Sequence, residues 1–470
     1  MVKMVTTWSG YHPVYPSRAD GGIYGKCVVR INIMADSPQP GDLKSVSELQ
    51  SPGTSLAEQI RRGRMLFLAM AVAYTLGNFN DNFNKQAVSL LALSHQHTGL
   101  PGLITILFTV PFLLFYAAAG WLADRFPRRR VIIASKIMEL IFLSLGGVGI
   151  MTLNWPLIVA VIFLMAVEAT IFGPALSGCI PDVYPESYVV HANAKLTSAT
   201  TAGILLGVVA AGLALNLKGT VHGLPLGRLV AACSLVVVSV IGLLVSFGVP
   251  YRPAGNSQEP FPWAGPLSSL KDLWNLRTDD LLTACVITYA YFWFIAGLQI
   301  LFINKMGKVQ FGLSDATTSY LALAEMLGVV IGSLAAGKIV AQDNGLWITP
   351  GATVMLAVFL GLSGMAPKFP GPAKVIFLLS MLACAGVAGG LMMVPLGSFF
   401  QTRPAPDKRG RVIAAAGFAA STGLLLAGII YIPLQKHLQS STVFLLMGLL
   451  TLPVAMAIIP IFKRCKTQGL

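Results

Sequence analysis

The residues best suited to chemistry in this chain lie in one short stretch, Gly77–Gln86, whose sequence is GNFNDNFNKQ. It interrupts an apolar run, Met65–Leu93, with amides, one acid and one base. At helical spacing, four of these polar residues fall on one stripe: Asn78, Asp81, Asn82 and Lys85. Asp81 and Lys85 are four residues apart, so they can neutralise each other. Because a charge at the centre of a bilayer costs about 3 kcal/mol, such residues must face protein or water.

Two roles fit a polar stretch of this kind. It can line a transport path, or its amides can fasten one helix to its neighbours, since buried amides also join helices within membranes. We favour the transport path. The residues of the stretch that we predict to bind substrate or to act as a gate are Asn78, Asn80, Asp81, Asn82, Lys85 and Gln86.

The elements that position these side chains must be membrane-spanning helices. The chain has 470 residues, of which 55% are hydrophobic and only 11% are charged, with a mean hydropathy of +0.72. A soluble domain carries about 25% charged residues. The formal charge of +14 fits cationic loops against anionic lipid rather than nucleic acid, because no basic stretch is interleaved with aromatics in a soluble domain. The six cysteines predict neither a disulfide framework nor a metal site, and we expect no cofactor.

Apolar segments of about 20 residues predict twelve spans. The segments are 65–93, 101–123, 131–153, 155–179, 190–217, 225–248, 279–303, 315–340, 346–366, 372–398, 410–432 and 440–462. The sequence predicts an all-α membrane protein with two six-helix bundles, at residues 61–248 and 279–470, joined by a cytoplasmic linker at 249–278. Residues 1–60 are expected to form a disordered cytoplasmic tail, unless translation starts later, at Met34 or Met65.

Loop cations predict the orientation. Eighteen Lys and Arg residues fall on the side of the linker and seven on the other side. By the positive-inside rule, the first side is cytoplasmic. Both termini are then inside the cell, which fits an even number of spans.

A second motif joins segments two and three, with the sequence GWLADRFPRRR from Gly120 to Arg130. It resembles the signature loop of the major facilitator superfamily, G-x-L-a-D-R-x-G-R-R-R, with Pro127 in place of the usual Gly. The resemblance implies a latch that holds the two bundles in one conformation. Gly120 is expected to permit close backbone approach. The predicted latch residues are Gly120, Asp124, Arg125, Arg128, Arg129 and Arg130.

The opening stretch narrows the resemblance. Phe79–Phe83 is similar to the F-[GN]-D-N signature of the bacterial lysophospholipid transporter family, and the residues around Phe172–Ala175 and Leu313–Asp315 are similar to two further segments of it. The resemblance implies alternating-access transport of lysophospholipid to the cytoplasmic leaflet of a bacterial inner membrane. Leu176 stands where the family has Lys, and Gln299 stands where some members have Arg, so two cations that could hold a phosphate are absent.

Other polar residues lie inside the predicted spans. Lys136 and Glu139 are three apart and predict either a structural pair or a pathway role. Glu168, Gln299 and Glu325 complete the predicted substrate or gating set, since an intramembrane carboxylate indicates function and can carry a proton. Glycines of segments five and eight, including Gly207 and Gly328, predict close helix packing.

Three function classes follow from these patterns. The first is transport of lysophospholipid or another amphipathic molecule, by a protein expected to act as a monomer among membrane lipids. The alternative is a proton-coupled transporter or exporter of another small solute. An integral-membrane enzyme is not expected, because the sequence has no His-x4-Asp, Gly-rich phosphate loop or nucleophile elbow.

Overall fold

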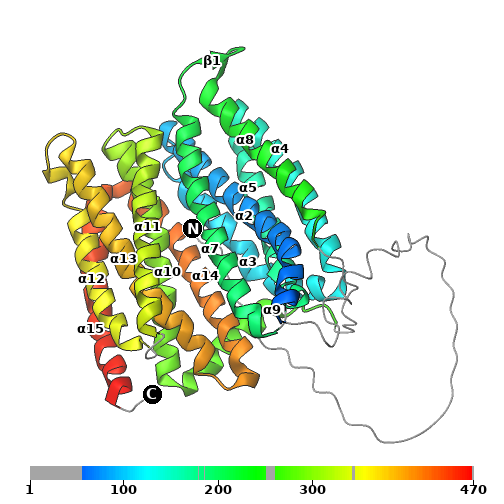
Figure 1. Cartoon of the computed structure of the whole chain (residues 1–470). Coiled ribbons are helices and arrows are strands. Elements are labelled where there is room, and N and C mark those ends of the chain that lie inside the picture. Colours follow the sequence, from blue (N-terminus) through cyan, green and yellow to red (C-terminus); the bar gives the residue numbers. More distant parts are fainter. Residues whose placement is uncertain (1–55, 178, 185, 250–259, 341–344, 468–470) are drawn as a thin grey trace, which may run out of the picture.

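Long apolar runs separated by short polar turns become twelve long helices in the computed structural model, which describes residues 56–177, 179–184, 186–249, 260–340 and 345–467 (Figure 1). The six in the N-terminal half are α2 (Leu56–Ser94), α3 (Leu100–Arg125), α4 (Arg128–Thr152), α5 (Trp155–Ser177), α7 (Glu186–Leu215) and α8 (Leu226–Ser246). The six in the C-terminal half are α10 (Asp280–Lys305), α11 (Asp315–Val340), α12 (Thr349–Ser363), α13 (Ala373–Thr402), α14 (Pro406–His437) and α15 (Ser440–Thr467).

Among the described residues, eleven helices are long and apolar enough to cross a membrane, and α2 is the long helix outside that set. The reason is the polar stretch Gly77–Gln86, which lowers the hydropathy of the middle of α2. The twelve predicted spans correspond to the twelve long helices one by one, so the predicted fold class is confirmed.

Shorter elements mark the two ends of the molecule. Strands β1 (Thr220–Val221) and β2 (Leu224–Pro225) pair in antiparallel fashion between α7 and α8. His222 and Gly223 between them both have positive φ, 49° and 79°, as a two-residue hairpin turn of type I′ requires. We call this the hairpin end. At the opposite end, helix α9 (Gly265–Asn275) connects the two halves, and we call it the linker end (Figure 1).

The remaining short helices are α6 (Ile180–Val183), η2 (Leu276–Thr278), the π-helical turn η3 (Met306–Gln310), η4 (Leu346–Ile348) and η5 (Ala366–Lys368). Two sequence expectations need correction here. Residues 56–60, expected in the disordered tail, form the first turns of α2, and residues 1–55 lie outside the described part of the chain. The linker holds the helix α9, which its Pro and Gly content did not predict, while its residues 250–259 lie outside the described part.

Close helix packing follows the glycines, as predicted. In α7, a Cβ on Gly207 would lie 2.5 Å from the carbonyl oxygen of Phe79 in α2. In α11, a Cβ on Gly328 would overlap the carbonyl oxygen of Ala383 in α13. Glycine therefore allows these helix pairs to approach with their backbones nearly in contact.

The two halves have separate apolar cores and meet along two seams. One core is built almost entirely from α10–α15, and the others from the N-terminal helices. Helix α3 packs against α14, and α7 packs against α11. In Figure 1, α4 and α8 lie on the outer side of the N-terminal half, and α12 and α15 lie on the outer side of the C-terminal half.

Candidate functional site

The polar stretch of α2 is buried almost completely. Its buried polar side chains are Asn78, Asn80, Asp81, Asn82, Asn84 and Gln86, while Lys85 is half-buried. They contact several neighbouring helices, so the polar surface of α2 extends beyond the single stripe expected from helical spacing. Asn78 and Asn82 donate to carbonyl oxygens of their own helix, Tyr74 and Asn78, both at 2.8 Å.

Asn80 belongs to a polar network inside the N-terminal half. Its Nδ2 donates to Oε1 of Glu139 in α4 at 2.8 Å and to Oγ of Ser239 in α8 at 3.0 Å. The other carboxylate oxygen of Glu139 pairs with the fully buried ammonium of Lys136. That ammonium also lies 4.2 Å from the centre of the Phe172 ring. Of the two roles left open for Lys136 and Glu139, this geometry supports the structural pair.

Lys85, the basic residue of the stretch, lies against α3. Its Nζ is 3.9 Å from the centre of the Phe108 ring, a cation–π contact that holds the charge away from lipid. Asp81, one turn earlier on the same face, is buried. The pair therefore places an acid and a base on the same side of α2.

Gln86 connects the two halves of the molecule. Its Nε2 donates to Oδ1 of Asn304 in α10 at 3.0 Å and to Oγ of Ser319 in α11 at 3.1 Å. Asn304 Nδ2 donates back to Gln86 Oε1 at 3.0 Å. This reciprocal amide pair is buried, so its bonds are made without competition from water. Sequence reasoning included Gln86 but missed Asn304 and Ser319, because nothing in their local sequence shows that they face α2.

Other contacts between the halves also lie toward the hairpin end. The Tyr431 hydroxyl of α14 donates to the carbonyl oxygen of Thr98 at 3.0 Å. In α3, a Cβ on Gly102 would lie 2.8 Å from the Tyr431 ring and 2.9 Å from the carbonyl oxygen of Gly428. The side-chain hydrogen bonds that Gln86, Asn304 and Tyr431 make between the halves are all at this end. The structure is therefore closed at the hairpin end.

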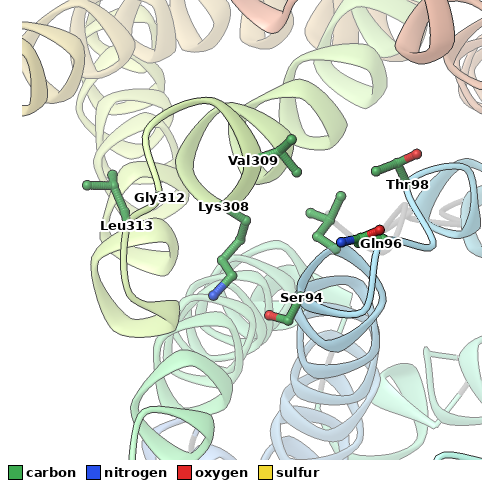
Figure 2. Close-up of a pocket in the computed structure, with 8 residues that line it drawn as sticks. Ser94, Gln96, Thr98, Lys308, Val309, Gly312 and Leu313 are labelled. Atoms are coloured by element: carbon green, nitrogen blue, oxygen red, sulfur yellow. The ribbon is translucent and has the colours of Figure 1, made fainter.

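A hollow of about 350 Å³ marks the outer edge of this closure. It lies between the α2–α3 turn, which contributes Ser94, Gln96 and Thr98, and the η3 segment, which contributes Lys308 and Val309 (Figure 2). Lys308 Nζ pairs with Asp315 Oδ1 at 2.7 Å at the start of α11. At the lower end of the range of about 300–1,000 Å³ for ligand pockets, this hollow is small for a lipid.

The remaining predicted residues are buried on separate helices. Glu168 lies near the middle of α5 and Glu325 near the middle of α11. Gln299 is buried in α10, and within the described part of the chain its Nε2 has no hydrogen-bond partner. The inclusion of these three side chains in one site with the polar stretch of α2 stays a prediction.

The loop after α3 carries the predicted latch. Arg128 Nη2 lies 3.4 Å from Asp124 Oδ1, and Arg129 Nη2 donates to the carbonyl oxygen of Phe247 at 2.8 Å. The Arg125 guanidinium is 5.9 Å from the Trp121 ring, and Arg130 is exposed. These contacts all stay within the N-terminal half.

One latch expectation needs correction. Nothing lies within 4 Å of a Cβ built on Gly120, so no backbone approaches it in this conformation. Gly120 lies inside α3 near its linker end, and the contacts of Arg128 and Arg129 in the loop that follows are made within the N-terminal half.

Another correction concerns Lys305, which the loop count placed outside the membrane. It is buried at the end of α10, where its ammonium donates to the carbonyl oxygens of Gln435 and Leu438, the latter at 3.2 Å. A cation at the last carbonyls of α14 is favourable because it satisfies free acceptors and complements the helix dipole.

We expect Gly102→Val to prevent closure at the hairpin end. The added side chain would clash with Tyr431 and Gly428, and overpacking costs about 1–3 kcal/mol, roughly a tenfold shift in conformational balance. Spin labels at Gln96 and Val309, exposed residues on either side of the hollow, would report a longer distance. Gly120→Ala is the matched control and should leave this distance unchanged. An unchanged distance in Gly102→Val would disprove the role of this seam.

Comparisons with known proteins agree with this architecture. A family model described as the Major Facilitator Superfamily matches residues 63–428. A curated relative from Cronobacter sakazakii, named lysophospholipid transporter LplT, is 26% identical over 389 residues, which cover 80% of this chain and 89% of the relative. The protein of the same name from Escherichia coli O157:H7 is 26% identical over 407 residues, which cover 83% and 89%.

Solved structures agree on the fold. The nucleoside transporter NupG aligns with a TM-score of 0.61 at 14% identity, over 85% of this chain and 99% of its own. A bacterial homologue of the iron transporter ferroportin, in an inward-facing state, aligns with a TM-score of 0.62 at 13% identity, over 87% and 99%. These relatives are transporters, not enzymes. The chain, with its twelve helices in two halves and a family match over most of its length, is a multi-pass membrane transporter that belongs to the Major Facilitator Superfamily.

Proposed function

We propose that this transporter moves lysophospholipid by alternating access across a bacterial inner membrane to the cytoplasmic leaflet. The observation that carries the proposal is the similarity to the two lysophospholipid transporters over at least 80% of the chain, together with the buried FNDN segment in α2. A polar patch on one helix, surrounded by apolar surface, suits a cargo with a charged head and a single acyl chain.

The polar head is assigned to Asp81, Asn82 and Lys85. A zwitterionic or anionic headgroup needs a cation for its phosphate, and Lys85 supplies one where Leu176 and Gln299 do not. Asp81 can pair with an amine of the head. Asn82 keeps its carbonyl oxygen available, because its Nδ2 is the group that bonds to its own helix.

The linker end is assigned to the cytoplasm, because the loop arginines lie there. The conformation closed at the hairpin end then opens toward the cytoplasm, and both termini lie inside the cell. The halves 61–248 and 279–470 are the bodies that move, and a single chain contains both. We assign the latch residues of the α3–α4 loop to the opposite conformation, in which the linker end closes.

Transport into proteoliposomes tests the proposal. Purified protein should move a lysophospholipid with a labelled headgroup and not the diacyl lipid with the same headgroup. Asp81→Asn and Asn82→Ala should each weaken transport about tenfold or more, since a hydrogen bond to a charged group is worth about 1.5–3 kcal/mol. Asn84→Ala, an equally buried amide of α2 outside the predicted site, is the control.

Two outcomes would contradict the proposal. Transport that is unchanged in Asp81→Asn and Asn82→Ala would remove the site assignment. A protein that ignores lysophospholipid but moves another solute down a pH gradient would support the alternative of proton-coupled transport. The buried carboxylates of Glu168 and Glu325 are the groups that would then carry the proton.

A further inference from the structure

Helix α9 lies across the two halves at the linker end. It packs against α3 on one side and α14 on the other. A Cβ on Gly265 would lie 2.6 Å from the Cβ of Ala117 in α3, so the start of α9 touches the N-terminal half closely. Leu273 at its end and Leu276 just beyond pack against the core of the C-terminal half. One face of α9 is therefore occupied by protein from both halves.

The opposite face of α9 is apolar and exposed. Leu267, Leu270 and Trp274 are 68%, 51% and 65% exposed, and their spacing places them on one stripe of the helix. Trp263, just before the helix, is 87% exposed. We call these four residues the α9 stripe. Exposed apolar side chains gathered on one face indicate an interaction surface rather than scattered surface residues.

The position of α9 along α3 indicates what covers the stripe. Ala117 lies eight residues before Arg125, the last residue of α3, which corresponds to about 12 Å along the helix axis. The start of α9 is thus beside α3 and not beyond its end. Phe261 extends this attachment, because its ring lies 5.3 Å from that of Trp121 in α3. A helix at this depth, beside a membrane-spanning helix, meets the border between lipid headgroups and acyl chains.

Two cations lie next to the stripe, together with the acid Asp272 on the same helix. Lys271 is exposed on the flank of α9, and the guanidinium of Arg277 lies 3.6 Å from the centre of the Trp274 ring. The arginines of the α3–α4 loop are at the same end of the molecule. Tryptophan prefers the membrane interface, and cations near an anionic surface favour binding to it.

We propose that α9 is an interfacial helix whose stripe inserts into an anionic bilayer leaflet while its other face bridges the linker ends of α3 and α14. The lipid surface thereby holds a strap across the seam between the halves. This assignment rests on the faces of α9 and does not depend on which cargo the protein transports. Because α9 contacts both halves, its attachment to lipid opposes their separation at this seam.

Tryptophan fluorescence of the whole protein in nanodiscs tests the insertion. The difference between the emission of the wild type and that of the Trp263→Phe/Trp274→Phe variant is the emission of the two tryptophans of the stripe. We expect phosphatidylcholine brominated near the headgroup to quench this emission about threefold more strongly than aqueous iodide does. Emission quenched by iodide but not by brominated lipid, or shielded from both quenchers as under a bound protein, would overturn the proposal.

Two matched charge variants distinguish a stripe that is inserted into lipid from a helix α9 that is folded but not inserted. Leu267→Asp/Leu270→Asp places two acids on the stripe and should remove the quenching by brominated lipid. Ser268→Asp/Asn275→Asp places two acids on exposed flank positions of the same helix and should retain it. Adding phosphatidylglycerol should shift the stripe emission to shorter wavelength, and Lys271→Gln/Arg277→Gln should abolish that shift. Equal behaviour of the two acid pairs would contradict the proposal.

Discussion

Replacing Lys136 by Met is expected to destabilise the protein by about 3–5 kcal/mol, because it leaves a buried carboxylate without its counter-charge. The Lys136 ammonium is fully buried, pairs with Glu139 and lies over the Phe172 ring. A Cβ at Gly77 would lie 2.7 Å from that ammonium, so α2 is shaped to make room for it. Asn80 bonds to the same carboxylate, and the loss therefore extends from α4 to α2.

The thermal unfolding midpoint in one detergent measures this effect. Lys136→Met/Glu139→Leu should recover most of the lost stability, since apolar residues of similar volume often replace a buried pair at little cost. Arg128→Met is the surface control. Its pair with Asp124, at 3.4 Å and exposed to solvent, is worth about 0–1 kcal/mol. A Lys136→Met protein that melts like the wild type but does not transport would place Lys136 on the pathway instead.

This network shows how far sequence reasoning could go with the polar stretch. Hydropathy predicted that the stretch lies in a membrane-spanning helix, because a run of about 20 apolar residues has few alternatives in a membrane. Hydropathy could not show which polar side chains of the stretch join helices together and which line a transport path. Asn80 turns to α4 and α8, whereas Gln86 turns to α10 and α11, and the choice depends on helix packing. A single helical stripe cannot describe neighbours on several sides.

The errors of the sequence reading have a common origin in long-range contacts. A Cβ on Gly120 would have no neighbour within 4 Å, and which other helices approach this part of α3 depends on how the halves pack. Lys305 looked like a loop cation, but α14 ends beside it and offers free carbonyl oxygens. Helix α9 was not predicted because Pro and Gly residues surround it in the sequence. The helix packs on α3 and α14, and these contacts stabilise it. Local composition carries none of this information.

Gln86→Ala is expected to open the hairpin end. The change removes three hydrogen bonds between the halves, two donated by Gln86 and one accepted from Asn304. Each hydrogen bond contributes about 0.5–1.5 kcal/mol, and water replaces part of the loss. The closed form should therefore become about 2 kcal/mol less stable relative to the form open at this end. That corresponds to about a 30-fold shift toward the form open at this end. Spin labels at Gln96 and Val309 measure the shift as a longer distance across the mouth.

Asn82→Ala distinguishes a gate from any buried amide. Asn82 lies one turn before Gln86 on α2, is equally buried, and donates to the carbonyl oxygen of Asn78 in its own helix. Its removal should leave the distance across the mouth unchanged, even where it weakens transport. The Gln86→Ala/Asn304→Ala variant should open no further than Gln86→Ala alone, because Gln86→Ala already removes the reciprocal pair with Asn304. If Gln86→Ala instead behaves like Asn82→Ala, the amide pair only fills space between the halves, and the closure must depend on the α3–α14 seam at Gly102 and Tyr431.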